Sequence, residues 1–238
     1  MYGYGYYGWG MDPTVLLLVI GMLLSLVASA KLHSTFAVYK KIRNHSGITG
    51  AEAAQRILRA AGITDVQVVP IRGSLTDHYD PRTKTVSLSE DIYGRNSLAA
   101  VGVAAHECGH AIQHAHGYAP MSVRAALVPV VNIGSNLSIP LIFLGVLLSW
   151  NQTLIQLGIW AFALTVIFQL VTLPVEFNAS RRAIVKVEEY GLLGSEEVSG
   201  GKKVLTAAAL TYVAGAASSA LQLLRLILLY GGNRRRRN

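Results

Sequence analysis

Three apolar runs set the strongest limit on how this chain can fold. Residues 127–150 and 154–173 are each long enough to cross a bilayer core, which needs about 20 residues. Residues 15–30 approach that length when their flanks, from Pro13 to Lys31, are included. Over the whole chain 52% of the residues are hydrophobic and 14% are charged, whereas about 25% are charged in a typical soluble domain. The sequence therefore predicts a membrane protein.

Basic residues orient the first apolar run. Four of them follow it closely: Lys31, Lys40, Lys41 and Arg43. By the positive-inside rule, the carboxyl end of this run is cytoplasmic and the amino terminus lies outside. Residues 1–12 contain no Lys or Arg, so we expect no cleavable secretory signal. The single cysteine excludes an internal disulfide, so the fold does not depend on an oxidising compartment.

Only residues 151–153 separate the second and third apolar runs, which predicts a tight membrane hairpin. Pro129 and Pro140 predict kinks in its first arm. A hairpin returns the chain to the face that it left. We therefore expect the residues just before 127 and just after 173 to share one face of the membrane.

A fourth apolar run, residues 204–230, admits two interpretations. Lys202 and Lys203 precede it, Arg225 interrupts it, and residues 234–237 are all arginine. If this run crossed the membrane, one basic cluster would lie on the wrong side. We therefore favour a helix that packs on the bundle or lies at the interface, with a fourth crossing as the alternative. The net charge of +8 indicates lipid contact and topology rather than nucleic acid, because the basic residues flank apolar runs.

Residues 34–126 have the composition of a small folded domain. Thr49 and Glu52 have the spacing of a capping box, and Gly62 fits the position after a last helical turn, so a helix is predicted between them. Two short runs of strand-forming residues follow, VQVV and KTVSLS. The stretch DHYDPRTK between them is typical of a turn. We expect a small antiparallel sheet.

A second helix, which begins at Asn96 or Ser97, carries the sequence HECGH. His106 and His110 are four residues apart, so their imidazoles lie on one helical face and can share a zinc ion. Glu107 would lie beside the metal, where it can take a proton from water. This is the H-E-x-x-H arrangement of zinc peptidases. The alternative, a helix with solvated histidines, is less favoured because the preceding AAVGVAA is apolar and unpaired polar groups are costly to bury.

A catalytic zinc site needs a third protein ligand, and the chain offers two. His116 stands where the longer H-E-x-x-H-x-x-G-x-x-H motif has its last histidine, but Gln113 replaces the glycine on which that motif turns. Glu176 directly follows the hairpin, with Pro174 suited to the first turn of a helix. Because the hairpin returns the chain to the same face, Glu176 can reach the metal.

Three stretches, HECGHAIQH, VSLSEDIYGRNSLAAVGVAAHE and LPVEFNASRRA, together resemble the YugP family of membrane-embedded zinc metallopeptidases. More distantly, the layout is similar to HtpX and the CAAX-prenyl protease, gluzincins that also place membrane helices between their H-E-x-x-H and their glutamate ligand. The resemblance implies that His106, His110 and Glu176 bind one Zn²⁺ per chain. It implies that Glu107 is the general base. It also implies a minimal gluzincin core in which the TVSLS strand pairs with an extended substrate by edge addition.

The glutamate end departs from the wider pattern. HtpX-like enzymes and thermolysin have an aspartate four residues after the glutamate ligand, and it helps to orient a ligand histidine. Here that residue is Ser180, with Asn178 between. Either side chain can accept a hydrogen bond from an imidazole, but neither brings a negative charge.

Five more residues near the motifs have an ordinary and a functional interpretation. His114 and His116 are more often structural than cleft-lining. Arg181 and Arg182 are better explained as anchors beside a membrane helix than as groups that stabilise an oxyanion. Cys108 faces away from the motif histidines and is expected to be a packing residue.

We expect an α+β membrane protein, with a gluzincin core, a small antiparallel sheet and three or four transmembrane helices. Its function would be that of a zinc endopeptidase at the cytoplasmic face of the cell membrane. Zinc would polarise the scissile carbonyl, and Glu107 would pass a proton from water to the leaving amine. Its partners would be membrane lipid and a peptide or membrane-protein substrate.

The alternatives are a metal-binding transporter, a sensor or a catalytically weak scaffold. They are less favoured because the apolar runs contain few ionisable residues and structural zinc usually has four ligands. The expected division has five parts. They are a tail and first membrane helix (1–33), a catalytic domain (34–126), a hairpin (127–173), a glutamate-ligand region (174–203), and a C-terminal helix with a basic tail (204–238).

Overall fold

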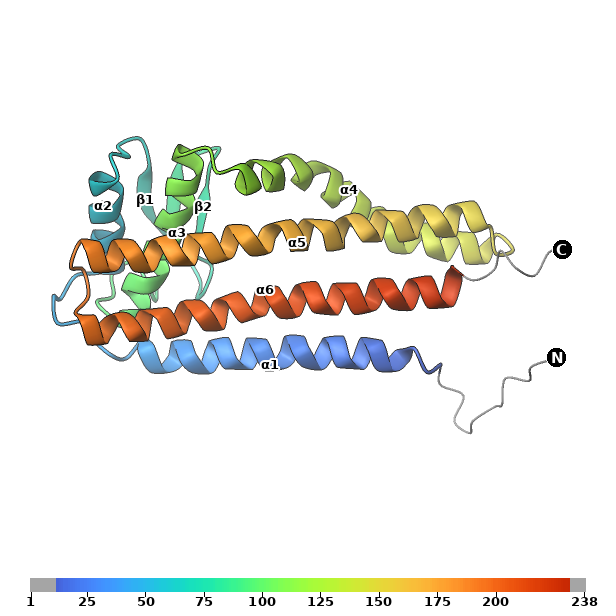
Figure 1. Cartoon of the computed structure of the whole chain (residues 1–238), viewed down its shortest axis with the longest axis horizontal. Coiled ribbons are helices and arrows are strands. Elements are labelled where there is room, and N and C mark those ends of the chain that lie inside the picture. The colour runs from blue at the N-terminus through green and yellow to red at the C-terminus, as the bar shows by residue number, and fades with distance from the viewer. Residues whose placement is uncertain (1–11, 232–238) are drawn as a thin grey trace.

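The computed structural model describes residues 12–231. In chain order the elements are α1 Val15–Tyr39, α2 Gly50–Ala60, β1 Gln67–Ile71, β2 His78–Asp80, β3 Thr85–Ser89, α3 Leu98–Ala115, α4 Ala119–Leu147, α5 Gln152–Glu189 and α6 Ser195–Tyr230. A compact unit of α2, α3 and the sheet lies at one end, and the long helices extend away from it (Figure 1). The expectations for the amino-terminal tail before Asp12 and for the arginines at 234–237 lie outside the described residues.

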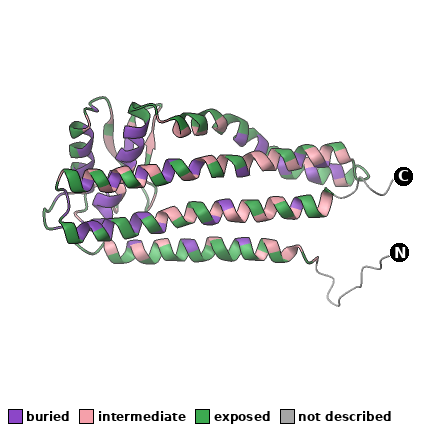
Figure 2. Ribbon diagram, in the orientation of Figure 1, coloured by how far each residue is buried: buried purple, intermediate pink, exposed green. Residues whose placement is uncertain are grey.

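Four helices, α1, α4, α5 and α6, are long and apolar enough to cross a membrane. Away from the compact unit they expose much of their surface (Figure 2). Large apolar side chains are among the exposed residues, with Phe143 at 68% and Trp160 at 72% exposure. A water-facing surface rarely carries so extensive an apolar area. All three apolar runs that we expected to cross the membrane therefore lie in helices of suitable length.

The C-terminal apolar run lies in α6, between α1 and α5 and antiparallel to both (Figure 1). The helix packs on the bundle, but the preference for a helix that does not cross stays a prediction. The helix also has the length and composition of a crossing helix, and it runs alongside α1 rather than across the end of the bundle. This arrangement fits the fourth crossing better than an interfacial helix.

The hairpin is formed by α4 and α5. Pro129 and Pro140 both lie inside α4, which bends towards α5 along its course (Figure 1). Asn151 closes the turn, because its side chain accepts hydrogen bonds from the backbone N–H groups of Thr153 and Leu154. The tight connection is therefore stabilised by an N-cap.

α5 continues without a break from the second arm of the hairpin to Glu189. The expectation that Pro174 stands in the first turn of a new helix is wrong, because Pro174 lies inside α5. Proline cannot donate the usual hydrogen bond to the preceding turn. The packing of α5 against α3, α4 and α6 offsets that loss. As a result, the hairpin arm and Glu176 belong to one helix.

The small sheet is mixed, not antiparallel as predicted. Its order is β1-β3-β2, with β1 parallel and β2 antiparallel to β3. The stretch that we expected to be only a turn contains β2, which reverses the chain so that β3 runs in the same direction as β1. Because β3 has a neighbour on each side, edge addition to TVSLS is also a wrong expectation. The edge strand next to α3 is β2.

The predicted caps of α2 and α3 are confirmed. Thr49 and Glu52 form a capping box, and Gly62 follows α2 with a φ of +71°. Ser97 accepts a hydrogen bond from the backbone N–H of Ala100 at 3.1 Å. These caps fix where α3 begins, and the buried core gathers around α3, α2 and the adjoining ends of α5 and α6 (Figure 2).

Candidate metal centre

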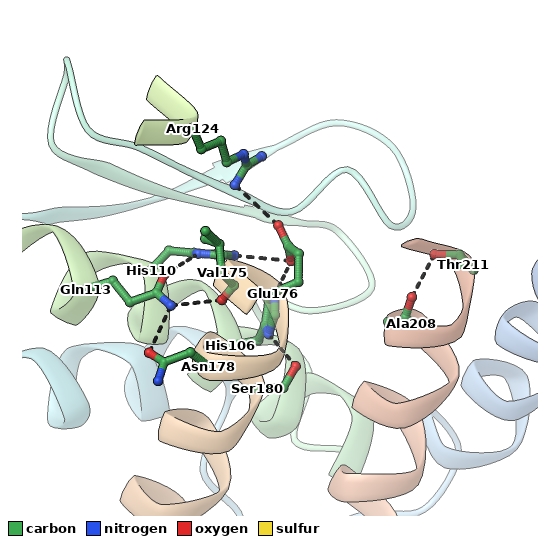
Figure 3. A network of polar contacts seen from close by, with 10 residues as sticks. All are labelled: His106, His110, Gln113, Arg124, Val175, Glu176, Asn178, Ser180, Ala208 and Thr211. Carbon is green, nitrogen blue, oxygen red and sulfur yellow. Dashed lines mark hydrogen bonds and ion pairs between the residues drawn. The ribbon is translucent and has the colours of Figure 1, made fainter. Parts of the chain in front are cut away.

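α3 and α5 bring three metal-ligand side chains together. His106 and His110 lie one turn apart on α3, with ring centroids 4.8 Å apart. Glu176 of α5 faces them, and its Oε2 lies 3.3 Å from His106 Nε2 and 3.5 Å from His110 Nε2 (Figure 3). One ligand atom from each residue lies within 4.8 Å of the other two. The structure thus brings together the three residues that the sequence suggested as ligands.

A buried polar network orients His110. The Gln113 side chain donates from Nε2 to the Val175 carbonyl at 2.8 Å and to Asn178 Oδ1 at 3.0 Å. These two bonds turn Gln113 Oε1 towards His110 Nδ1, at 3.0 Å. An amide oxygen can only accept, so Nδ1 carries the proton. In the neutral ring, Nε2 then points a lone pair at Glu176.

Asn178 and Arg182 support this network from α5. Arg182 Nε donates to Asn178 Oδ1 at 2.7 Å, which fixes the orientation of the Asn178 amide. The Arg182 guanidinium also lies 5.9 Å from the centre of the Tyr118 ring. Arg181 is exposed and lines a separate groove between α5 and α6. Neither arginine lines the cleft beside the metal ligands, so neither is placed to stabilise an oxyanion there, and an anchor role stays a prediction.

His106 has a simpler partner. Its Nδ1 lies 3.1 Å from Ser180 Oγ, the residue at the position where related enzymes have an aspartate. Arg124 of α4 lies 3.3 Å from Glu176 Oε1, so the other oxygen, Oε2, is left to face the histidines. Each of the three side chains in the cluster therefore has a hydrogen-bond partner on its outer side, away from the other two.

The donor set fits a zinc ion. Two imidazole nitrogens and one carboxylate oxygen are the protein ligands of one class of catalytic zinc site. Glu176 and His110 are buried, with only 3% of the Glu176 side chain exposed, and His106 is half-buried. Nitrogen lone pairs repel a carboxylate oxygen at this distance unless a cation lies between them. A zinc ion would satisfy all three groups.

A cleft of about 260 Å³ opens beside this cluster. It is walled by β2, the first turns of α4, and Tyr212 of α6. A smaller cavity of about 150 Å³ reaches the cluster from the side of α1 and α6. Asp77, His106, Glu107 and Tyr212 line both spaces. The cluster is therefore accessible from two directions.

Glu107 lies next to His106 and is itself buried. Burial raises the pKa of the Glu107 carboxyl above its ordinary value, although His106 and His110 act in the opposite direction. A carboxyl with a raised pKa is better suited to take up and return a proton near neutral pH. Its position beside the cleft allows contact with a bound water or substrate.

A protein family described as "Putative neutral zinc metallopeptidase" matches residues 14–231, a span that includes both halves of the cluster. The chain belongs to this neutral zinc metallopeptidase family. A Bacillus subtilis (strain 168) protein named "Putative membrane protease YugP" is 47% identical over 193 residues, which cover 81% of this chain and 85% of that protein. No solved structure matches the chain. The resemblance that the sequence suggested is confirmed.

In this member of the neutral zinc metallopeptidase family, His116 is not part of the cluster. α3 remains helical as far as Ala115, and His116 is exposed at its end. His114 Nδ1 lies 2.8 Å from the Tyr79 hydroxyl and so ties the end of α3 to β2. Cys108 is buried against α2, as expected of a packing residue.

Three residues of the site were missed by the sequence reasoning: Gln113, Arg124 and Tyr212. Gln113 was noticed only as a substitute for glycine, although its position three residues after His110 places both on one helical face. Arg124 and Tyr212 come from α4 and α6, far from the motif in sequence. No local pattern distinguishes them from other residues of those helices.

Proposed function

We propose that this chain is a membrane-embedded, zinc-dependent endopeptidase that acts at the cytoplasmic face of the membrane. The observation that carries the proposal is the meeting of His106, His110 and Glu176 beside a cleft that Glu107 also lines. The family and the name of the Bacillus subtilis relative support it. The four long apolar helices support an active site close to the bilayer.

The distribution of charge supports the orientation. If all four long helices cross, α1 begins and α6 ends on the side away from the compact unit (Figure 1). Lysines and arginines lie at the ends of α1 and α6 that adjoin the compact unit: Lys31, Lys40, Lys41, Arg43, Lys202 and Lys203. These six basic residues outnumber the four arginines at 234–237, which a fourth crossing would leave on the other side. By the positive-inside rule the end that adjoins the compact unit is therefore cytoplasmic.

His106 Nε2, His110 Nε2 and Glu176 Oε2 would hold the zinc ion. When bound, zinc polarises the scissile carbonyl and lowers the pKa of a water towards neutrality. Gln113 and Ser180 hold the imidazole rings with Nε2 facing inward. Such partners typically contribute 10- to 100-fold to metal affinity, as an order of magnitude.

Glu107 acts as the general base. Its carboxylate takes a proton from the attacking water and later gives that proton to the nitrogen of the leaving amine. The burial that raises its pKa makes the carboxylate a stronger base for the first of these transfers. The neighbouring histidines lower the pKa and so favour release of the proton in the second.

The cleft provides places for the substrate backbone. β2 is an edge strand that lines the cleft, so an extended peptide can pair with it by strand addition. Tyr212 of α6 also lines the cleft, and its hydroxyl can donate a hydrogen bond to the carbonyl oxygen as negative charge develops there. Arg124 is occupied by Glu176 and mainly positions that carboxylate.

The decisive experiment compares the parent with Glu107→Gln in detergent. Zinc per chain and cleavage of an unfolded casein substrate are measured for both, with the exposed Glu90→Gln as the control. We expect about one zinc in all three proteins. Cleavage should be lost only in Glu107→Gln, by roughly 100- to 10,000-fold. If all bind zinc and none cleaves casein or a membrane-inserted substrate, the chain is a metal-binding scaffold instead.

A further inference from the structure

A second site lies between α1 and α6, away from the metal cluster. It is a groove of about 740 Å³ whose lining residues come only from these two helices. Three of them are lysines: Lys31, Lys202 and Lys203. None of the lining residues is acidic, and none belongs to the cleft beside the metal ligands.

The positive charge of this groove is not neutralised by the protein. Within residues 12–231, none of the three lysines forms an ion pair. Lys203 Nζ lies 5.9 Å from the centre of the Tyr39 ring, a contact that leaves its charge in place. Ser34 and Thr206 also line the groove, but their hydroxyls donate to the backbone carbonyls of Lys31 and Lys202. The three ammonium groups therefore supply the positive charge, and they favour an anion with several oxygens.

The groove also lies at a defined depth. The apolar run of α1 ends at Ala30, just before Lys31, and the apolar run of α6 begins at Val204, just after Lys203. The helices are antiparallel and packed together, with Gly21 against Ser218 and Tyr39 against Gly200. Lys31 therefore lies nearer the membrane than Lys202 and Lys203, and both boundaries fall within the length of the groove. Ala207 and Leu210 line its deeper, apolar part. Cationic and apolar side chains therefore line the same groove, with Lys202 and Lys203 at its outer end and Lys31 beside the apolar residues.

We propose that this groove binds an anionic membrane phospholipid. The headgroup phosphate lies among Lys31, Lys202 and Lys203, and an acyl chain follows Ala207 and Leu210. Basic pockets between membrane helices on the cytoplasmic side are suited to such headgroups. The lysines alone would also suit free phosphate, but the apolar residues beside them favour a lipid. The proposal rests on membrane embedding and is independent of peptidase activity.

The test measures which lipids stay bound. The full chain is placed in nanodiscs of equal parts phosphatidylcholine and phosphatidylglycerol and transferred to mild detergent, and bound lipids are counted by native mass spectrometry. We expect the parent to retain phosphatidylglycerol in preference to phosphatidylcholine. The triple variant Lys31→Gln, Lys202→Gln, Lys203→Gln should lose that lipid by roughly tenfold.

Two further variants control for charge and folding. Arg56→Gln, Arg59→Gln, Arg82→Gln removes equal charge from exposed sites of the compact unit and should retain the lipid as the parent does. Replacing the three lysines by arginine keeps the charge and should also preserve binding, which keeps the test valid if the glutamine variant does not fold.

Three results would overturn the proposal. The first is equal retention of phosphatidylglycerol by the parent and by the folded glutamine triple variant. If the glutamine variant does not fold, loss of the lipid from the arginine variant takes its place. The second is an equal loss in the control triple variant. The third is displacement of the lipid from the parent by inorganic phosphate, which would mark a site for free anions. Neither zinc content nor cleavage enters this readout, so its outcome is separate from that of the peptidase test.

Discussion

Gly109 of α3 lies directly against the backbone of Ala179 of α5. A Cβ added at Gly109 would stand 2.5 Å from the Ala179 carbonyl oxygen, closer than real side chains approach. Gly109 immediately precedes His110, and Ala179 lies one turn after Glu176. This contact therefore controls how closely the two halves of the metal cluster approach each other.

Substitution of this glycine should disturb the metal centre without touching a ligand. In Gly109→Ala the added methyl group forces α3 and α5 apart, so we expect the free energy of unfolding to fall by about 1–3 kcal/mol. Zinc affinity should fall with it, as measured by competition with a chelator. Gly94→Ala is the matched control, because a Cβ there meets nothing within 4 Å. Equal zinc affinity in both variants would contradict the role of this contact.

Loss of the distal ligand should abolish tight zinc binding. Glu176→Ala removes the only carboxylate of the three-residue cluster. Zinc affinity should therefore fall by more than the roughly 100-fold loss that is typical when a residue hydrogen-bonded to a ligand is removed. The readout is zinc per chain after dialysis against a fixed free zinc concentration. Glu188→Ala, an exposed change on the same helix, should behave as the parent. Full occupancy in Glu176→Ala would mean that another residue completes the site.

The buried amide of Gln113 should influence zinc binding through His110. Gln113→Met keeps a similar side-chain volume but removes the acceptor that holds the His110 Nδ1 proton. We expect zinc affinity to fall by about 10- to 100-fold. Chelator competition on the parent and the variant measures this change. An unchanged affinity would show that packing alone orients the ring.

Tyr212 should act on the rate of cleavage rather than on zinc. Tyr212→Phe keeps the ring that lines both cavities and removes the hydroxyl, so kcat should fall by about 100-fold. KM and zinc content should stay close to those of the parent. Tyr230→Phe, at the far end of the same helix, serves as the control. A change in KM alone would assign Tyr212 to substrate binding.

Local sequence signals predicted the elements that hold the site. The capping box at Thr49, the cap at Ser97 and the hairpin around residues 151–153 all depend on residues close in sequence. The separation of His106 and His110 places both on one face of any regular helix. The return of the chain through the hairpin explains why Glu176 could be suggested despite its distance in sequence.

Pairing over longer distances could not be predicted in the same way. The alternation in VQVV and KTVSLS indicates strands but does not tell a parallel pair from an antiparallel one. The short β2 lies in a stretch that contains the turn-forming Asp80–Pro81 pair, so the sequence indicates a turn there. Pro174 likewise predicts the start of a helix, because the packing that stabilises it within α5 comes from other helices and is not visible in the sequence.

The residues that support the metal cluster also depend on contacts between segments far apart in the sequence. Ser180 was considered because related enzymes have a functional residue at its position. Arg124 and Tyr212 lie near the metal cluster only because α4 and α6 pass beside it. Such contacts arise from tertiary structure, and single-sequence patterns do not contain them.

The position of the hairpin between His110 and Glu176 also sets an order of events during synthesis. A chain emerging from the ribosome presents both histidines and Glu107 before the third ligand has been translated. Glu176 meets them only after both arms of the hairpin have been made and the chain has turned back. A nascent or wrongly inserted molecule therefore has an incomplete metal centre, and peptidase activity would begin only when insertion is finished.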